Sequence, residues 1–319
     1  MKNKIIIKIF VFLFFLNNTS YSKDIQFKAN EIEFLKDKNL TIAYEGSANI
    51  ENDEIIIKGQ KIQYFNKKFL LIADEGNIFI KDKNLEIESN KIEYNVNESN
   101  LNFKNKVQIK DNQNNLIINS NEVIFDNKKK IITSKSNSEI YDGVGNYYKI
   151  GYFEYSLDKK LIKLKDIEIL DNSKNIYKTD QAFLDLTNKE LAAKDIDLEF
   201  KSPQGTENEP RLKGRSLISD QNNTIVKKGT FTLCKKREDC PPWEMSADEI
   251  KHDKKKKTIY YKNASLKIYD QKVFYFPKFF HPDPSVKRQT GFLIPKIQDN
   301  TTSGLSLNLP YFIALADNK

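Results

Sequence analysis

The chain has 319 residues, a formal net charge of +8 and a mean hydropathy of −0.61. Hydrophobic residues make up only 39% of it, yet 21 Phe and 15 Tyr are present, a mixture that suits thin sheets with one apolar face. The positive charge does not indicate nucleic-acid binding. Lys alternates with Asp and Glu along the chain and far outnumbers Arg, and the densest run, residues 254–257, lies in a turn-like setting.

The first 22 residues have the features of a secretory signal peptide. Lys2 and Lys4 precede the apolar run Ile5–Leu16, and Ser20–Ser22 supplies small side chains at the positions that a signal peptidase reads. The run is too short to span a bilayer as a helix. We therefore expect residues 1–22 to be removed on export.

Internal similarity is the most informative feature of the remaining sequence. Six short segments recur at intervals of 29 to 31 residues, and each has apolar residues at its second and fourth positions. This period of two is typical of a strand with one buried face, whereas a helix would repeat at three and four. The segments are 31–34, 61–64, 91–94, 122–125, 152–155 and 181–184.

A second strand is expected within each unit. Gly46 and Gly76 precede two of these strands, and Asn-Lys and Asp-Lys pairs mark the turns between them. Stacked units would form an all-β, slit-like sandwich over residues 23–230. Its apolar interior either is filled by its own side chains or holds an elongated apolar ligand, and periodicity does not decide between the two. The second strands are 47–50, 77–80, 106–109 and 138–141.

Residues with potential catalytic or metal-binding chemistry are few. Cys234 and Cys240 are disulfide candidates in an exported protein, and no Cys or His pair lies close enough in sequence to complete a zinc site. Neither His252 nor His281 lies in a nucleophile motif, and the segment 143–145 lacks the third glycine of a dinucleotide loop. We predict no catalytic residue, metal or cofactor.

After the repeats, a series of short blocks follows in a distinctive order. In that order the blocks resemble the lipopolysaccharide-assembly outer-membrane proteins, also called the organic-solvent-tolerance family. The resemblance is dense over residues 231–319. Over residues 23–230 it rests on the thirty-residue unit, which periplasmic lipopolysaccharide bridge proteins share. The blocks are Cys234, Trp243, Ala247–Asp253, Tyr261–Ala264, Phe274–Pro277, Pro282–Pro295 and Leu309–Tyr311.

The resemblance implies a β-jellyroll that is open along one side and docked beneath a transmembrane β-barrel. The expected organisation is a signal peptide (1–22), a periplasmic jellyroll (23–230), a cysteine-containing connection (231–290) and the first barrel strands (291–319). The chain stops at Lys319, near the expected second barrel strand; a fragment, a truncated gene or a split product would each explain this.

The function implied by the resemblance is lipopolysaccharide transport and assembly at the cell outer membrane. The jellyroll would lie in the periplasm, accept the lipid and shield its lipid A acyl chains, and the barrel would release it through a lateral gate. The residues expected to line the lipid path are Ile62, Tyr64, Ile92, Tyr94, Val123, Phe125, Phe153 and Tyr155.

Three further expectations come with the resemblance. The N-terminal strand Ile25–Phe34 would add to the sheet of a periplasmic bridge protein by β-augmentation, although Glu31 and Glu33 could instead only protect a free edge. A lipoprotein would plug the barrel. The cysteines would bond to cysteines late in the barrel, with a local Cys234–Cys240 bond as the alternative.

Pro295 and Pro310 are the predicted lateral-gate residues. Both fall inside expected barrel strands, 292–298 and 305–312, where a residue without an N–H weakens strand pairing. The alternative is that each proline only marks the end of a strand. For the protein as a whole, the alternatives are a stand-alone periplasmic bridge protein and a structural β-solenoid or adhesin.

Overall fold

The structure is a computed structural model, and most of the residues that it describes lie in β-strands, which confirms the all-β prediction. Helical structure among them is limited to three 3-10 turns, at Lys36–Lys38, Asn66–Lys68 and Lys81–Lys83. No helix in this part of the chain is long and apolar enough to cross a membrane. The predicted signal peptide lies outside the described residues. These are residues 25–50, 55–201, 209–234, 242–286, 290–292, 296–300, 304–308 and 310–315.

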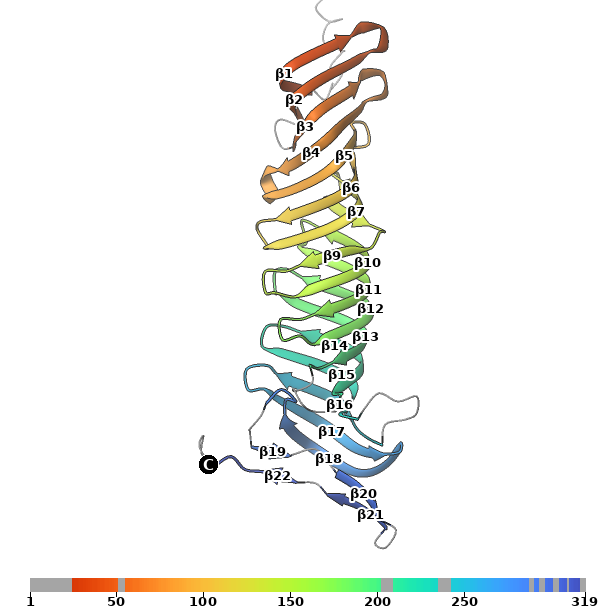
Figure 1. The fold of residues 1–319 in the computed structure, drawn as a ribbon, viewed down its shortest axis with the longest axis vertical. Coiled ribbons are helices and arrows are strands. Elements are labelled where there is room, and N and C mark those ends of the chain that lie inside the picture. The colour runs from red at the N-terminus through yellow and green to blue at the C-terminus, as the bar shows by residue number, and fades with distance from the viewer. Residues whose placement is uncertain are drawn as a thin grey trace, which may run out of the picture.

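Eighteen of the described strands form one antiparallel sheet, drawn out into a long stack (Figure 1). β1 (Gln26–Leu35) lies at one end and β18 (Gln271–Pro282) at the other, and neighbours in sequence pair with each other. At ~4.8 Å per strand the stack is roughly 80 Å long. The strands between them are β2 (Leu40–Ile50), β3 (Ile55–Phe65), β4 (Leu70–Ile80), β5 (Leu85–Asn95), β6 (Asn100–Asp111), β7 (Leu116–Asp126), β8 (Ile131–Ser134), β9 (Ser138–Tyr141), β10 (Tyr147–Ser156), β11 (Leu161–Leu170), β12 (Ile176–Asp185), β13 (Glu190–Glu199), β14 (Arg211–Ser219), β15 (Asn223–Thr232), β16 (Trp243–Asp253) and β17 (Thr258–Ile268).

The two-strand repeat is confirmed. The six predicted first segments lie in β1, β3, β5, β7, β10 and β12, and the predicted second strands lie in β2, β4, β6 and β9. The change of sequence pattern near residue 230 is not a change of fold, because β15 pairs with β16 and the sheet continues to Pro282. Trp243 and Met245 are buried in β16, so that strand keeps the alternation which holds it in the sheet.

Most of the long strands are bent near the middle, so the sheet folds over and its two halves face each other. In β5, β7, β10 to β13 and β15 to β17, buried residues are two positions apart on either side of the bend and three apart across it. The extra residue restores the inward direction of the side chains after the chain turns the corner. In β5, the buried positions are Leu85, Ile87 and Ser89 before the bend and Ile92 and Tyr94 after it.

The bend depends on local backbone geometry. Glu45 in β2, Glu75 in β4 and Asp166 in β11 take up left-handed conformations there, with φ of 48°, 47° and 53°. The glycine after Glu75 is needed for a close approach, because a Cβ on Gly76 would lie 2.3 Å from the carbonyl oxygen of Lys58. The small residue at position 76 therefore allows β3 and β4 to turn the corner together.

The turns between strands form two rims along the side opposite the bends. The first rim comprises turns 36–39, 66–69, 96–99, 127–130, 157–160, 186–189, 220–222 and 254–257, and the second comprises 81–84, 112–115, 142–146 and 171–175. Successive turns of the first rim are joined by backbone hydrogen bonds, for example Val96 N to Phe69 O at 2.9 Å and Leu157 N to Lys130 O at 3.0 Å. These bonds join the first rim from turn 36–39 to turn 186–189, and again from turn 220–222 to turn 254–257.

One strand position is split. β8 pairs with one half of β7 and β9 with the other, so together they occupy a single place in the stack. At the break, Ser120 lies in hydrogen-bond contact with Ser134 at 3.0 Å and with Ser136 at 2.9 Å. Hydroxyl groups thus take over where the ladder is interrupted.

The residues expected to begin the barrel form two small two-stranded sheets. β19 (Gly291–Phe292) pairs with β22 (Tyr311–Phe312), and β20 (Lys296–Asn300) pairs with β21 (Gly304–Asn308). Pro310 therefore lies between β21 and β22 rather than inside one strand 305–312, as in the strand-end alternative. Pro295 lies outside the described residues.

Candidate functional site

The predicted lining residues come together between the two halves of the sheet. They belong to one apolar cluster that runs along the stack, with Tyr64 packed against its edge. The half-buried ring of Tyr64 lies 6.3 Å from the ring of Phe27 on the facing half. Their contact with lipid stays a prediction. The fully buried members are Ile62, Ile92, Tyr94, Val123, Phe125 and Phe153, each 0% exposed, and Tyr155, 1% exposed.

The facing half supplies a second apolar row that the sequence analysis did not single out. The sequence carried a signal for this row, because an apolar residue that faces inward recurs five residues later in the same strand. Ile57 and Ile62 in β3 are an example. Because both rows are buried by each other, their own side chains fill this part of the interior. A lipid chain would therefore have to part the two halves in order to lie between the rows. The second row includes Ile57, Ile87, Ile109, Ile118, Ile150 and Ile169.

The two rims are joined across the open edge near the middle of the stack. Lys83 Nζ on the second rim lies 2.8 Å from Asp158 Oδ1 on the first. Tyr155, close to the first rim, donates a hydrogen bond from its hydroxyl to the carboxylate of Asp111, which is 4% exposed at the second rim. We call these two contacts the clasp.

A groove of about 1270 Å³ lies along the open edge between the two rims. This exceeds the ~300–1,000 Å³ typical of small-molecule sites. Apolar side chains from the interior and charged side chains from the turns both line it, so it presents adjoining apolar and charged surface. The apolar lining includes Leu116, Tyr148, Ile169, Tyr177, Leu184, Leu191 and Val286; the charged lining includes Asp142, Asp171, Asp185, Lys189, Lys201, Lys254 and Lys257.

Two repeated turns position the tyrosines of the groove. Asp142 Oδ1 accepts a hydrogen bond from the backbone N–H of Asn146 at 2.8 Å, and its Oδ2 accepts one from the Tyr148 hydroxyl at 2.9 Å. Burial, and then the charge of Asp142, raises the pKa of Tyr148, so its hydroxyl stays protonated and donates. The next unit repeats the arrangement with Asp171, Asn175 and Tyr177.

A close contact between a buried histidine and a buried aspartate borders the groove near its C-terminal end. His252 Nε2 lies 2.6 Å from Asp283 Oδ2, and the two side chains are 9% and 10% exposed. Burial alone would raise the pKa of Asp283, but hydrogen bonds from His252 and Ser285 outweigh it and lower that pKa to about 2. The carboxylate is therefore charged under ordinary conditions, and it ties the end of β16 to the residue after β18.

His281 lies beside this pair and is held neutral. Its Nδ1 is 2.6 Å from the carbonyl oxygen of Pro282, and its Nε2 is 2.7 Å from the Tyr261 hydroxyl. Burial lowers the pKa of His281 from 6.5 to about 4, although the Pro282 carbonyl and the charge of Asp283 act in the opposite direction. In the neutral ring, Nδ1–H donates to the carbonyl and Nε2 accepts from the tyrosine.

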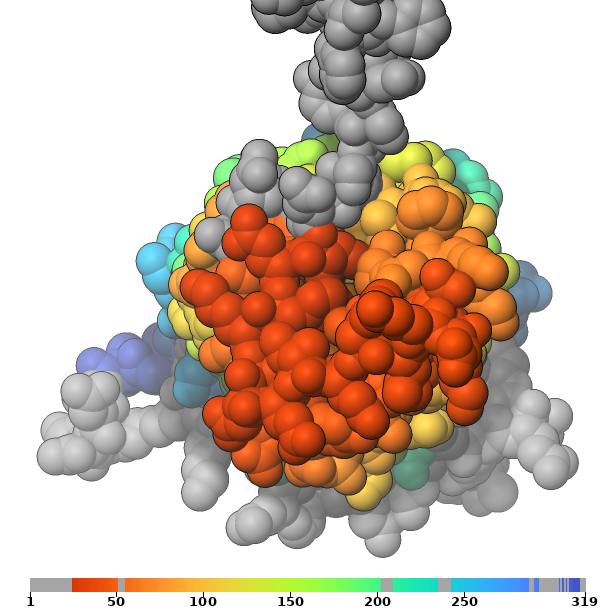
Figure 2. All heavy atoms as spheres, turned by 90° about the horizontal axis from the view of Figure 1, so that it is seen from above, coloured from red at the N-terminus to blue at the C-terminus, as the bar shows by residue number. Residues whose placement is uncertain are grey.

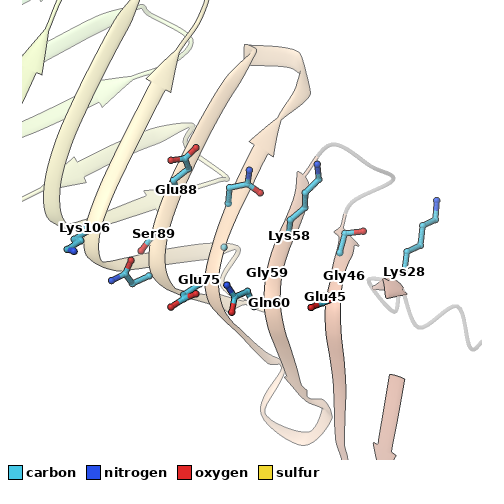
Figure 3. A pocket seen from close by; sticks show the side chains of 14 residues that line it. Lys28, Glu45, Gly46, Lys58, Gly59, Gln60, Glu75, Glu88, Ser89 and Lys106 are labelled. Atoms are coloured by element: carbon cyan, nitrogen blue, oxygen red, sulfur yellow. The ribbon is translucent and has the colours of Figure 1, made fainter. Parts of the chain in front are cut away.

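A polar depression of about 830 Å³ follows the outer side of the bends near the N-terminal end (Figure 3). Its charged residues come one each from β1 to β6 and lie in a row across the strands. The residues that line it are charged, amide, serine and glycine residues without a large apolar side chain, so we do not take this depression as the candidate site. The charged residues are Lys28, Glu45, Lys58, Glu75, Glu88 and Lys106.

The predicted disulfide stays a prediction. Cys234 is half-buried, with Sγ 3.7 Å from the carbonyl oxygen of Trp243, while Cys240 lies outside the described residues. Neither the local bond nor a bond to a later cysteine is tested.

Comparison with known proteins finds LPS-assembly proteins LptD. The chain is 35% identical to the LPS-assembly protein of Shewanella denitrificans over 99 residues. The matched segment covers 31% of this chain and 12% of the relative. The resemblance expected from the sequence is confirmed. The LPS-assembly protein of Yersinia pestis is 35% identical over 102 residues (32% of this chain, 13% of the relative), and that of Escherichia coli O157:H7 is 29% identical over 148 residues (46% and 18%). No protein-family model matches the chain. The matched parts are thus a small share of these LPS-assembly proteins.

Proposed function

We propose that this protein is a non-catalytic lipopolysaccharide conduit that works at the outer membrane. Its repeat domain would lie in the periplasm, receive lipopolysaccharide from a bridge protein and pass it towards a membrane barrel. The observation that carries the proposal is the apolar interior, which continues along the stack and borders a large groove between the two rims. The names of the relatives support it.

The chemistry of the groove suits an amphiphile with long acyl chains. At ~0.8 kcal/mol per methylene, a chain of about twelve carbons would cost roughly 10 kcal/mol to expose to water. Leu116, Ile169 and Leu184 would shield such chains, while Lys189 and Lys257 on the first rim stay within reach of the polar head group. A fully enclosed cavity would have no room for the sugars of the head group.

The N-terminal end fits the proposed bridge partner. β1 pairs with β2 alone among the described strands, and it forms the outermost layer of that end of the stack (Figure 2). Ile32 and Phe34 in β1 are 50% and 53% exposed. Replacing both by Asp should prevent capture of a purified periplasmic bridge protein. Unchanged capture would reject this end as the docking site.

The lateral gate and the lipoprotein plug are proposals that come from the resemblance. In a protein with a complete barrel, Pro295→Ala with Pro310→Ala should add hydrogen bonds worth ~1 kcal/mol each and tighten the seam. Lipopolysaccharide export should then fall while the barrel still folds. Unchanged export would remove the gate role from both prolines.

Photo-crosslinking tests the conduit directly. In the full chain, crosslinkers at Tyr94 and Phe125 in the interior should label lipopolysaccharide more strongly than crosslinkers at Lys61 and Glu93 on the outer faces of β3 and β5. Tyr64, at the edge of the interior, should also label. Equal labelling from the inner and outer faces would overturn the conduit and favour the filled scaffold.

A further inference from the structure

The last strand of the stack, β18, exposes apolar side chains on both of its faces. Phe274 is paired with the buried Leu266 and therefore faces inward, yet it is 51% exposed. Tyr275, the next residue, faces outward and is 60% exposed. Phe280, also on the outer face, is 36% exposed, and its ring centroid lies 6.1 Å from that of Tyr260 in β17.

This pattern differs from that of a strand with one face in water. Such a strand carries polar residues on its outer face, as β16 does with Glu244, Glu249 and Lys251. Six of the large apolar side chains that are exposed in the described residues fall within residues 260–280. An edge strand with two apolar faces should be covered on both sides.

The aromatic surface continues into the C-terminal segment. Ring centroids lie 5.3 Å apart for Phe276 and Phe279, 4.9 Å for Phe279 and Phe292, and 4.9 Å for Phe292 and Tyr311. Beyond Tyr311, the side chain of Leu315 is 86% exposed. The exposed surface thus follows the chain out of the stack instead of ending at β18.

Lysines accompany these rings. Lys267, opposite Lys272, is already paired with Glu244 at 2.8 Å and with Asp270 at 3.2 Å, but Lys262 of β17 lies directly opposite Lys278 of β18. Like charges in facing positions destabilise a sheet in water. The arrangement is favourable where an anionic surface lies against the strands, since lysines near such a surface gain electrostatic energy.

We propose that β18 forms a membrane-contact surface that seats the C-terminal end of the stack on an anionic phospholipid leaflet. The rings of Phe274, Tyr275 and Phe280 enter the head-group region, where aromatic side chains are favoured. Lys272 and Lys278 lie against lipid phosphates. The proposal goes beyond lipopolysaccharide transport and holds whether or not the interior carries lipid.

Flotation with vesicles that contain no lipopolysaccharide tests it. The mature full chain is mixed with vesicles of phosphatidylethanolamine and phosphatidylglycerol. Phe274→Ser with Tyr275→Ser should lower the partition constant about tenfold. The matched control is Phe183→Ser with Ile218→Ser, which removes an exposed apolar pair, 43% and 50% exposed, from β12 and β14 and should leave binding unchanged.

Variants of the two lysines distinguish the contribution of charge to vesicle binding from that of apolar contact. Lys272→Gln with Lys278→Gln should weaken binding about threefold to vesicles with phosphatidylglycerol and not at all to vesicles of phosphatidylcholine alone. A second readout needs no change to the rings: an environment-sensitive amino acid at Tyr269 should shift to the blue on vesicles, and the same probe at Tyr141 in mid-stack should not.

Two results would overturn the proposal. One is equal flotation of the serine variant and its control, together with no spectral shift at Tyr269. The other is patch-dependent dimerisation without vesicle binding, which would assign the surface to a second copy of the chain. Because lipopolysaccharide is absent from the vesicles, neither result bears on the conduit itself.

Discussion

Tyr155→Phe should loosen the middle of the stack, because it removes the hydroxyl contact of the clasp and leaves only the contact between Lys83 and Asp158. That side chain is 1% exposed, and its hydroxyl donates to the carboxylate of Asp111, which is 4% exposed. Asp111 keeps backbone donors at Gln113 and Asn114, each at 3.0 Å, so the substitution does not leave its charge without a partner.

The expected cost is that of one hydrogen bond to a charged group, roughly 2 kcal/mol in the free energy of unfolding. Tyr148→Phe is the matched control. It removes a tyrosine hydroxyl that donates at 2.9 Å to Asp142, but both partners lie at the second rim. Both variants should lose similar stability in urea titrations followed by circular dichroism, and only Tyr155→Phe should loosen the contact between rims.

Amide hydrogen exchange distinguishes the two variants. In Tyr155→Phe, exchange should become faster in both turns 112–115 and 157–160, which the clasp connects. In Tyr148→Phe it should become faster in 142–146 without a change at 157–160. The same exchange pattern in both variants, or a loss of stability well below 1 kcal/mol for Tyr155→Phe, would refute the claim that this hydroxyl holds the rims together.

Three further predictions follow from buried groups. Folding lowers the pKa of His281 from 6.5 to about 4, so the unfolded chain binds more protons than the folded chain between these pH values. The stabilisation should therefore be fully present above pH 6.5, and the free energy of unfolding should fall by roughly 3 kcal/mol towards pH 4. Urea titrations of His281→Gln should show no such pH dependence. Ile92→Ala, at a residue with 0% exposure, should cost about 3 kcal/mol, whereas Ile117→Ala, at 40% exposure, should cost under about 1 kcal/mol in the same assay. Mass mapping of a non-reduced digest should find Cys234 joined to Cys240 in this chain; two free thiols would reject the bond.

Strand repetition and the choice of buried face could be predicted from the sequence, because both depend on the alternation of apolar and polar side chains along each strand. Side chains alternate along a strand, so apolar residues at the second and fourth positions of a recurring segment already place Ile92 and Tyr94 on one face. The unit recurs about every thirty residues, and therefore stacking of like units was expected without knowledge of any contact between them.

Tertiary structure alone decided the rest. The bends in β2, β4 and β11 include left-handed residues such as Glu75, which no alternation signals. The clasp joins Lys83 to Asp158 from different repeats, and the groove gathers side chains from both rims. Phe274 is paired with the buried Leu266, yet the position of β18 at the end of the sheet leaves it exposed. The alternation of buried and exposed side chains along a strand depends on residues that are close in sequence. Contacts between the two rims and exposure at the end of the sheet depend instead on where the chain folds back and on which strand is the last of the sheet.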